Sequence, residues 1–448
     1  MMFILFLIFT NSLKPLFLVS GFNGSPLYAT VTQSQISYEA RDYCPKDLEE
    51  HFQFYPSVNP KFYMKYPDCQ AYLMSAHYDA KEKKVTPSPG VKIVSDNFGN
   101  YTSLLNFEKI VEYALAKGYT PYKDLFGIGY NFLLYPLDTD DTFAAIKENA
   151  ERVKKETGEK VVFISHSQGT HLVNQFLTSY SKLEWVKEYI DAAIFVAPAW
   201  AGVGNYRRLV NGDYGEFLTN ENMKKTLAKM PGQLILLPNY EAFGNKTVIY
   251  NYPQYGQNSI AKDIPNFLRN YLGILNQENS KIFEEVEKFL MKPIDEPPVR
   301  NYILYNSGIN TGVAYMVDKY TKDLRIVLGP GDGDYSPEGA EFACEHWKNV
   351  KCINWNLNKQ TYNHANMLKN IDASVEMIFD FVEGEPSTPA PTHKSKTDLY
   401  TIIFGVGIIM GLQILILVFS IIYIKKFYSD KSDGTLKESD TIKSTSEL

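Results

Sequence analysis

The sequence predicts an α/β domain, because short and strongly apolar segments are followed by polar or glycine-rich turns. Residues 15–19 (PLFLV), 160–165 (KVVFIS) and 324–328 (LRIVL) are runs of this kind and have the length of buried strands. A helical spacing of apolar residues follows the second run, over residues 170–180. We expect the three strands to lie in one sheet, with functional loops at its carboxyl edge.

Composition supports a large folded domain and excludes several classes of partner. Of the 448 residues, 45% are hydrophobic and 14% aromatic, which is more apolar material than a disordered chain carries. The net charge is -6, from 45 basic and 51 acidic residues, and no basic block suggests a nucleic-acid partner. The 4 cysteines lack CxxC spacing. We therefore expect neither a metal nor a cofactor.

Both ends of the chain are predicted to lie outside the folded domain. Residues 1–12 contain an apolar run too short to cross a bilayer, followed by small residues, which predicts a signal peptide without the usual basic start. The alternative is that residues 2–8 form an edge strand or the buried start of the domain. Residues 399–424 contain no charged residue and exceed the roughly 20 needed to span a bilayer, which predicts a transmembrane helix.

The segments that flank this helix predict its orientation. Lys425 and Lys426 follow it directly, so the positive-inside rule places the tail, residues 425–448, in the cytoplasm. Residues 384–398 are rich in Pro, Ser and Thr and predict an extended stalk. The chain is therefore expected to be a single-pass type I membrane protein. Its main domain, residues 13–383, would be lumenal or extracellular, at the plasma membrane or in an endolysosomal vesicle.

Two acceptor patterns for N-glycosylation agree with an exported domain. They are N-Y-T at Asn100 and N-K-T at Asn245, which predict surface positions in a secretory compartment. A third match begins at Asn23. It lies in a loop that we place at the active site below, and we expect it to stay unmodified.

The clearest chemical signal is the turn after residues 160–165. It reads Ser165-His-Ser167-Gln-Gly169 and leads directly into the predicted helix. Strand, sharp turn and helix form a nucleophile elbow, in which small residues two positions from the serine let the strand and the helix approach each other. Ser165 stands where glycine is usual. Ser167 is the candidate nucleophile, and an ordinary turn serine is the alternative.

A serine nucleophile needs a histidine base further along the chain. Of the 7 histidines, only His346 and His364 follow Ser167 without adjoining it or lying in the stalk. His364 comes after a predicted strand at residues 352–357, in a polar loop where a base is expected. His346 falls in a predicted helix and is better explained as a surface or packing residue. We therefore favour His364.

The third member of the triad is a carboxylate between the serine and the histidine. The glycine-rich loop after residues 324–328 contains Asp332 and Asp334. Such residues are common in ordinary turns, but this position in the chain favours a catalytic role. Spacing alone does not choose between the two aspartates.

An oxyanion hole requires two N–H donors near the nucleophile. One is expected from the main chain of Gln168, the residue after the serine. The second is expected from the loop at residues 20–25 (SGFNGS), which follows the first strand and whose glycines let N–H groups turn inward. Phe22 is the candidate there, through its main-chain N–H.

These segments together resemble the lecithin:cholesterol acyltransferase family, which includes lysosomal phospholipase A and the phospholipid:diacylglycerol acyltransferases. The resemblance covers about residues 14–382. PLFLVSGFNGSPL resembles the family's first strand and oxyanion loop, FVAPAWAGVGN its A-P-W-G-G stretch, and NHANML the segment around its histidine. GDGDYSPEG resembles G-D-G-D-G-T-V, which implies that Asp334 is the triad acid. The family implies an α/β-hydrolase fold.

The resemblance also implies a lid and a cap. Cys44 and Cys69 match a disulfide that closes a lid over residues 44–69, and residues 201–298 match an inserted cap. No cysteine lies near Ile303, where the family's second disulfide would need one, so Cys344 is expected to pair with Cys352. The lid carries an apolar load that suits either acyl chains or packing onto the domain: Phe52, Phe54, Tyr55, Phe62, Tyr63, Met64 and Tyr66.

Three positions depart from the family's pattern in charge or polarity. Asn131 and Leu133 stand at the Asp and the Arg of the family's Y-D-W-R segment, and Phe22 replaces a polar residue of the oxyanion loop. No member of the triad is lost, so these changes affect the expected substrate preference more than the expected activity.

The resemblance implies a lipid O-acyltransferase or phospholipase A that acts through a serine acyl-enzyme. The donor would be a membrane phospholipid, and the acceptor a sterol, a diacylglycerol or water. The alternative is a surface protein that kept the fold, lost turnover, and binds lipid or serves adhesion. Ser167, Asp334 and His364 in the right order argue against that alternative.

Overall fold

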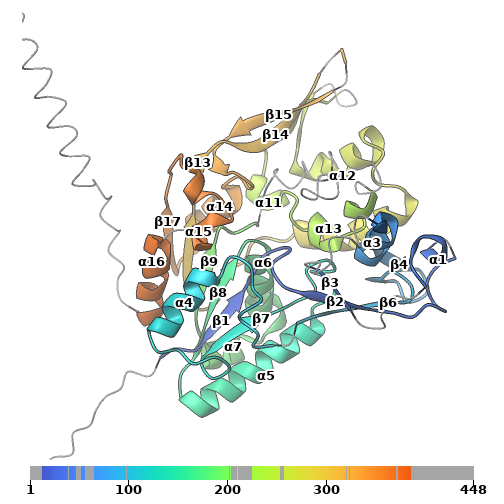
Figure 1. Ribbon diagram of the computed structural model, residues 1–448. Helices are drawn as coiled ribbons and strands as arrows, with labels where there is room; N and C mark the ends of the chain where they lie inside the picture. Colours follow the sequence, from blue (N-terminus) through green and yellow to red (C-terminus); the bar gives the residue numbers. More distant parts are fainter. Residues whose placement is uncertain are drawn as a thin grey trace, which may run out of the picture. The chain divides into compact units, whose positions relative to one another are not determined.

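A computed structural model describes residues 13–384, except for residues 39, 47–51, 56–64, 97, 201, 203–208, 210–224, 253–256, 319, 322 and 370–371 (Figure 1). The predicted signal peptide, transmembrane helix and cytoplasmic tail, and the predicted stalk beyond residue 384, lie outside the described residues. Within the described part of the chain, no helix has both the length and the apolar content needed to cross a bilayer.

Six parallel strands form the central sheet, in the order β17-β12-β9-β8-β1-β7. They are β1 (Leu16–Val19), β7 (Leu125–Ile128), β8 (Val161–His166), β9 (Ile190–Val196), β12 (Arg300–Tyr305) and β17 (Val350–Asn354). The strand order reverses beside β1, which lies between β7 and β8. The loops that follow β1 and β8 therefore leave the carboxyl edge side by side, where sites form in such sheets.

Helices cover both faces of this sheet, which gives three layers (Figure 1). On one face, Phe17 and Phe163 share a core with α5 (Asp140–Thr157), α6 (Gln168–Gln175) and α7 (Leu183–Tyr189). On the other face, Leu18 and Ile164 share a core with α4 (Glu108–Ala116), α15 (Asn366–Lys369) and α16 (Asp372–Glu383). Strands buried on both faces read as continuous apolar runs, which is why residues 15–19 and 160–165 could be predicted as strands. The architecture is α/β-hydrolase-like.

Helix α5 shows how local sequence sets the ends of these elements. Two aspartates, Asp140 and Asp141, lie in its first turn, and Lys154 and Lys155 lie in its last turn, which matches the helix dipole at both ends. The helix stops at Gly158, whose φ of 79° is left-handed and favours glycine.

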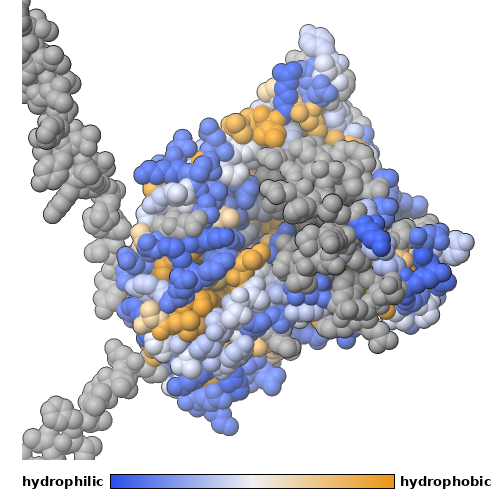
Figure 2. Space-filling model, in the orientation of Figure 1, coloured by the Kyte–Doolittle hydropathy of each residue, from blue (hydrophilic) through white to orange (hydrophobic). Residues whose placement is uncertain are grey.

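The structure corrects the placement of residues 324–328. They form β15 (Leu324–Gly329) in a second sheet, of order β11-β10-β14-β15, and not a strand of the central sheet. This sheet also contains β10 (Thr247–Tyr252), β11 (Gln257–Ile260) and β14 (Thr311–Val317). Strand β15 lies at the edge of this sheet, and its residues Ile326 and Leu328 are 39% and 62% exposed. It forms an antiparallel hairpin with β14, over which Figure 2 shows an apolar surface. A short apolar run does not reveal which sheet it joins.

The predicted cap contains several short helices beside β10 and β11. They are α10 (Pro231–Leu234), α11 (Tyr240–Phe243), α12 (Ile264–Asn266), the π-helix η3 (Phe267–Tyr271) and the longer α13 (Gln277–Leu290). Helix α13 begins with a capping box, in which the side chains of Asn276 and Asn279 each accept the other's main-chain N–H. Strands β14 and β15 complete the sheet of β10 and β11, so this layer extends beyond residue 298.

The predicted lid is partly built into a sheet. Strand β3 (Phe52–Tyr55) pairs antiparallel with β2 (Leu27–Val31), which also pairs with β6 (Val91–Ser95). Helix α1 (Ala40–Tyr43) precedes β3 and helix α3 (Pro67–Met74) follows it, and the hairpin of β4 (Ala76–Asp79) and β5 (Lys84–Pro87) comes next. Three of the lid's aromatic residues, Phe52, Phe54 and Tyr55, therefore belong to a strand and not to a loop.

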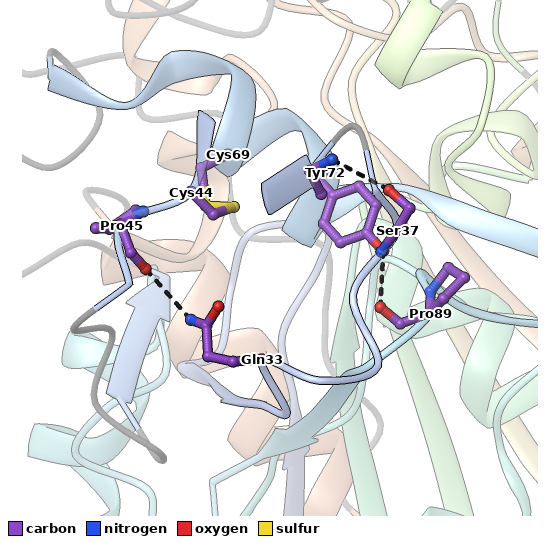
Figure 3. Close-up of a disulfide and its surroundings, with 8 residues drawn as sticks. Gln33, Ser37, Cys44, Pro45, Cys69, Tyr72 and Pro89 are labelled. Atoms are coloured by element: carbon purple, nitrogen blue, oxygen red, sulfur yellow. Dashed lines mark hydrogen bonds between the residues drawn. A yellow bond between two sulfur atoms is a disulfide. The ribbon is translucent and has the colours of Figure 1, made fainter. Parts of the chain in front are cut away.

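Both expected disulfides are present. Cys44 pairs with Cys69, across a sequence separation of 25, and joins the residue after α1 to α3 (Figure 3). Beside it, the Tyr72 hydroxyl donates to the Pro89 carbonyl at 2.7 Å, which holds α3 against the segment before β6. Cys344 pairs with Cys352, across a separation of 8, and joins α14 (Glu338–His346) to β17.

Candidate active site

Ser167 occupies the sharp turn between β8 and α6. Its φ of 55° and ψ of −126° are strained for a residue with a side chain, as an elbow nucleophile requires. The neighbouring backbone is very close: a Cβ on Gly169 would lie 2.4 Å from the Ser20 carbonyl oxygen, and a Cβ on Gly21 would lie 2.6 Å from the Ser167 Cβ. Glycine is therefore required at both positions. Ser165 fits as the remaining small residue and is fully buried.

Three side chains form a hydrogen-bonded line at this turn. The Ser167 Oγ lies 2.8 Å from the His364 Nε2, and the His364 Nδ1 lies 2.7 Å from the Asp332 Oδ2. The His364 and Asp332 side chains are both only 7% exposed. A buried carboxylate beside Nδ1 holds the proton on that nitrogen, which leaves Nε2 free to accept the serine proton.

The structure corrects the expected carboxylate. Asp334 is exposed, and its main-chain N–H donates to the Asp332 Oδ1 at 3.0 Å. Asp332 ends β16 (Gly331–Asp332), which pairs with β13 (Gly308–Ile309) in the register Ile309 to Asp332. This pairing fixes Asp332 next to the histidine, whereas Asp334 lies two residues further on in the turn. The register with β13, and not the family pattern, decides which carboxylate reaches His364.

The main chain of His364 is held from two sides. Its N–H donates to the Asp332 carbonyl at 2.9 Å, and its carbonyl lies 2.9 Å from the His166 Nε2. The rings of His166 and His364 are 4.9 Å apart. Burial, followed by the charge on His364, lowers the pKa of His166 to about 3, so this ring stays neutral and donates from Nε2. The sequence had drawn attention to His166 only as a neighbour of the serine.

The other candidate base lies away from the site. His346 is the last residue of α14 and is exposed, and its Nδ1 donates to the Phe342 carbonyl of the preceding turn at 2.8 Å. Its interactions belong to its own helix, as its position in a predicted helix suggested.

The two residues expected to supply the oxyanion hole follow adjacent strands, β8 and β1. Gln168 is the first residue of α6, so its N–H has no acceptor within the helix. Phe22 follows β1, and its ring packs edge-on against Phe132 with centroids 5.1 Å apart. The Phe22 ring therefore packs against the core, and its main-chain N–H remains the candidate donor.

A cavity of about 210 Å³ opens above the serine. Loops from both halves of the sheet edge form its wall, which is made of Gly21, Phe22, Asn23, Gly24, Leu105, Asn106, His166, Ser167, Asp334, Tyr335, His364 and Ala365. Asp334 therefore lies at the mouth of the site although it does not contact the histidine. Among the described residues, no cluster of His, Cys, Asp or Glu is arranged to hold a metal ion.

The side chains at the two positions that depart from the family's charged segment are both uncharged. Asn131 is buried and donates from Nδ2 to the Asp138 Oδ2 at 3.1 Å, and burial raises the pKa of Asp138. Leu133 is buried in the core. An amide and an alkyl group therefore occupy the positions at which the family has an Asp and an Arg.

The expected glycosylation sites differ in exposure. Asn245 is exposed, whereas Asn100 is partly buried and its Oδ1 accepts from the Thr102 hydroxyl at 2.8 Å. Asn23 lines the cavity and has a φ of 64°. A glycan on Asn23 would obstruct the site, in agreement with our expectation that it stays unmodified.

Comparison with known proteins agrees with this geometry. The family model for lecithin:cholesterol acyltransferase matches residues 59–270. Over this segment the chain is similar to the lecithin:cholesterol acyltransferase family. Among relatives within it, the lysosomal phospholipase A and acyltransferase of Mus musculus is 22% identical over 356 residues, which cover 75% of this chain and 82% of the relative.

Relatives from a plant and from a mammal match to a similar extent. The lecithin-cholesterol acyltransferase-like 1 protein of Oryza sativa subsp. japonica is 24% identical, over 76% of this chain and 80% of its own length. The phosphatidylcholine-sterol acyltransferase of Mus musculus is 22% identical, over 76% and 78%. Among solved structures, the lipase BlEst2 of Bacillus licheniformis aligns with 82% of this chain and 92% of its own, at 12% identity and a TM-score of 0.34.

Proposed function

We propose that this protein is a serine-dependent phospholipase A and lipid O-acyltransferase. The observation that carries the proposal is the line from the Ser167 Oγ through His364 to Asp332, with contacts of 2.8 and 2.7 Å. Similarity to the family supports the lipid class of the substrate, and the named activities of the relatives support acyl transfer.

The first half of the reaction forms the acyl-enzyme. The His364 Nε2 removes the Ser167 proton as Oγ attacks the carbonyl carbon of a phospholipid ester, and the carbonyl oxygen becomes an oxyanion. The main-chain N–H groups of Gln168 and Phe22 stabilise that oxyanion. Asp332 stabilises the protonated imidazole, which then gives its proton to the leaving lysophospholipid oxygen. The ester bond breaks, and the acyl group remains on Ser167.

The second half transfers the acyl group. An alcohol or a water molecule enters the cavity above Ser167, and His364 removes its proton as it attacks the acyl carbon. The tetrahedral intermediate collapses, and the proton passes from His364 to the Ser167 oxygen. A sterol or a diacylglycerol as acceptor yields a new ester, and water yields a free fatty acid.

The substrate lies in a membrane, and the proposal includes an anchor that keeps the enzyme there. A helix at residues 399–424 and a stalk at residues 384–398 would tether the domain to the lumenal or extracellular face of a bilayer. A tether raises the effective concentration of phospholipid at the site. The exposed apolar residues of the β14–β15 hairpin, Met316, Tyr320, Ile326 and Leu328, suit an enzyme that works at such a surface.

A labelling experiment tests the central claim. The full-length chain in detergent micelles is treated with a fluorophosphonate probe, and the modified peptide is identified by mass spectrometry. Covalent labelling of Ser167 that disappears in Ser167→Ala is expected. An unlabelled Ser167 in folded protein would favour a surface protein that binds lipid without turnover.

Product analysis then separates transfer from hydrolysis. Phosphatidylcholine vesicles with a radiolabelled acyl chain are incubated with the enzyme, alone or with cholesterol or diacylglycerol. Labelled ester in the presence of an alcohol identifies an acceptor, and free fatty acid alone identifies a phospholipase. Ser167→Ala should yield neither product.

A further inference from the structure

The side chain of Gln168 has partners that the proposed mechanism does not use. It is fully buried, its Oε1 accepts from the Tyr130 hydroxyl at 2.8 Å, and its Nε2 donates to the Gly232 carbonyl at 2.6 Å. Gln168 is not among the residues that line the cavity above Ser167. The side-chain amide therefore acts on chemistry only through the group it holds.

Both partners of this amide have fixed positions. Tyr130 is 1% exposed and its ring packs edge-on against Tyr135, and burial raises its pKa well above the usual range, so it remains a donor. The N–H of Gly232 donates to the Leu133 carbonyl at 2.8 Å. A Cβ at residue 232 would lie 1.7 Å from the Phe132 carbonyl oxygen. Only glycine lets α10 approach this closely.

Gln168 thereby joins three separate parts of the chain. Tyr130 lies in the loop after β7, 38 residues before Gln168, and Gly232 lies in α10, 64 residues after it. The first residue of α6 is thus attached to the central domain on one side and to the inserted segment on the other.

A purely structural explanation is weak. Burying an amide in an apolar core costs hydration free energy, and two hydrogen bonds offset only part of that cost. An apolar side chain of similar volume would therefore be at least as stable there. The main chain supplies a reason for the amide. Ser167, immediately before Gln168, has a strained backbone conformation with a φ of 55° and a ψ of −126°, and this ψ sets the orientation of the peptide that joins the two residues.

We infer that the Gln168 side chain is a positioning group for the oxyanion hole, because its bonds to Tyr130 and Gly232 fix the direction of the Gln168 N–H. The inference rests on the proposed function, since it concerns the same oxyanion. A donor in such a site must lie about 2.7–3.1 Å from the oxygen at the transition state, so a small rotation of this peptide is costly.

The main test replaces the amide with an apolar chain of similar length, in the full-length protein. Gln168→Met removes both hydrogen bonds, and Tyr130→Phe removes one and keeps the ring. We expect kcat to fall about 10- to 100-fold in Gln168→Met and several-fold in Tyr130→Phe, with KM within about twofold. The double variant should resemble Gln168→Met alone, because both changes break one connection.

A thionoester substrate separates positioning from general damage. Sulfur is larger than oxygen and accepts hydrogen bonds weakly, so a working oxyanion hole favours an ester over its thionoester analogue. In Gln168→Met, the ester-to-thionoester ratio of kcat should fall towards one. A partly unfolded enzyme loses both rates equally and keeps the ratio. Fluorophosphonate titration of Ser167 counts the active molecules in each preparation.

Gln70→Met is the matched control. Gln70 lies in α3, is also fully buried, and is not part of the site, so the same substitution should leave the ester-to-thionoester ratio unchanged. If Gln168→Met and Tyr130→Phe keep the wild-type kcat and ratio, the positioning role is wrong while the proposed function stands. If the wild-type enzyme neither reacts with fluorophosphonate nor turns over ester, the proposed function itself is wrong.

Discussion

The choice between Asp332 and Asp334 gives the sharpest test of the triad. The Oδ1 of Asp332 accepts from the main-chain N–H groups of Asp334 and Tyr335, at 3.0 and 2.7 Å, and its Oδ2 faces the His364 Nδ1. In Asp332→Asn, the amide oxygen keeps the two main-chain bonds, so the NH₂ group must face His364. That group donates to Nδ1, which moves the ring proton to Nε2 and removes the base from Ser167.

The expected loss is large because the wrong tautomer predominates. The corresponding change in a serine triad lowers kcat about 10⁴-fold, or about 5 kcal/mol of transition-state stabilisation. Asp334→Asn removes an exposed charge at the mouth of the cavity, so kcat should change by no more than about threefold.

The assay is the initial rate of fatty acid release from phosphatidylcholine vesicles, normalised to folded protein by circular dichroism. Asp332→Asn keeps the bonds that shape the loop, so its thermal unfolding should stay close to that of the wild type. A larger loss for Asp334→Asn than for Asp332→Asn, or a loss below tenfold for Asp332→Asn, would refute this reasoning.

Three further predictions concern close packing, protonation and the disulfides. Gly21→Ala places a Cβ 2.6 Å from the Ser167 Cβ, so kcat measured with vesicles should fall about 100-fold. The pKa of His166 is lowered to about 3 in the folded protein. As the pH falls below about 6.5, His166 therefore takes up a proton in the unfolded chain but not in the folded one. This uptake stabilises the unfolded chain, so the free energy of unfolding decreases. Urea unfolding at pH 7 and pH 5 should show that the wild type loses about 2 kcal/mol more than His166→Gln, and equal losses would contradict this. Replacing Cys44 and Cys69 with alanines should lower the free energy of unfolding in urea by about 3.5 kcal/mol, because this disulfide spans a sequence separation of 25. The same replacement of Cys344 and Cys352, which are separated by only 8, should lower it by about 2.5 kcal/mol.

Local pattern was sufficient to find the nucleophile and the base. Ser167 has a signature that fits within a few residues: a buried strand, a sharp turn and a helix, with Gly169 required by a carbonyl that would lie 2.4 Å from any Cβ. His364 followed from the order of triad members along the chain, because few histidines lie beyond the serine. Neither inference needed a contact between distant segments.

The acid could not be found in the same way. Asp332 and Asp334 have the same side chain, lie in the same loop and differ by two positions, so composition and spacing treat them alike. What separates them is the pairing of β16 with β13. Strand β13 begins at Gly308, 23 residues before β16 begins at Gly331. The preceding strand added to the difficulty. Its apolar run predicted a buried position in the central sheet, whereas it forms an exposed edge in the second sheet.

The same distinction explains why the role of the Gln168 side chain could not be predicted from the sequence. Its main chain was predictable, because the residue after an elbow serine supplies an N–H whatever its side chain. Its side-chain partners depend on how the loop after β7 and helix α10 fold against the elbow. The sequence also does not show that only glycine fits at position 232, where a Cβ would lie 1.7 Å from a carbonyl oxygen. Chemistry carried by a short segment is thus visible in the sequence. The groups that aim that chemistry come from segments brought together only by folding, so the acid and the positioning amide are where structure-based variants are most informative.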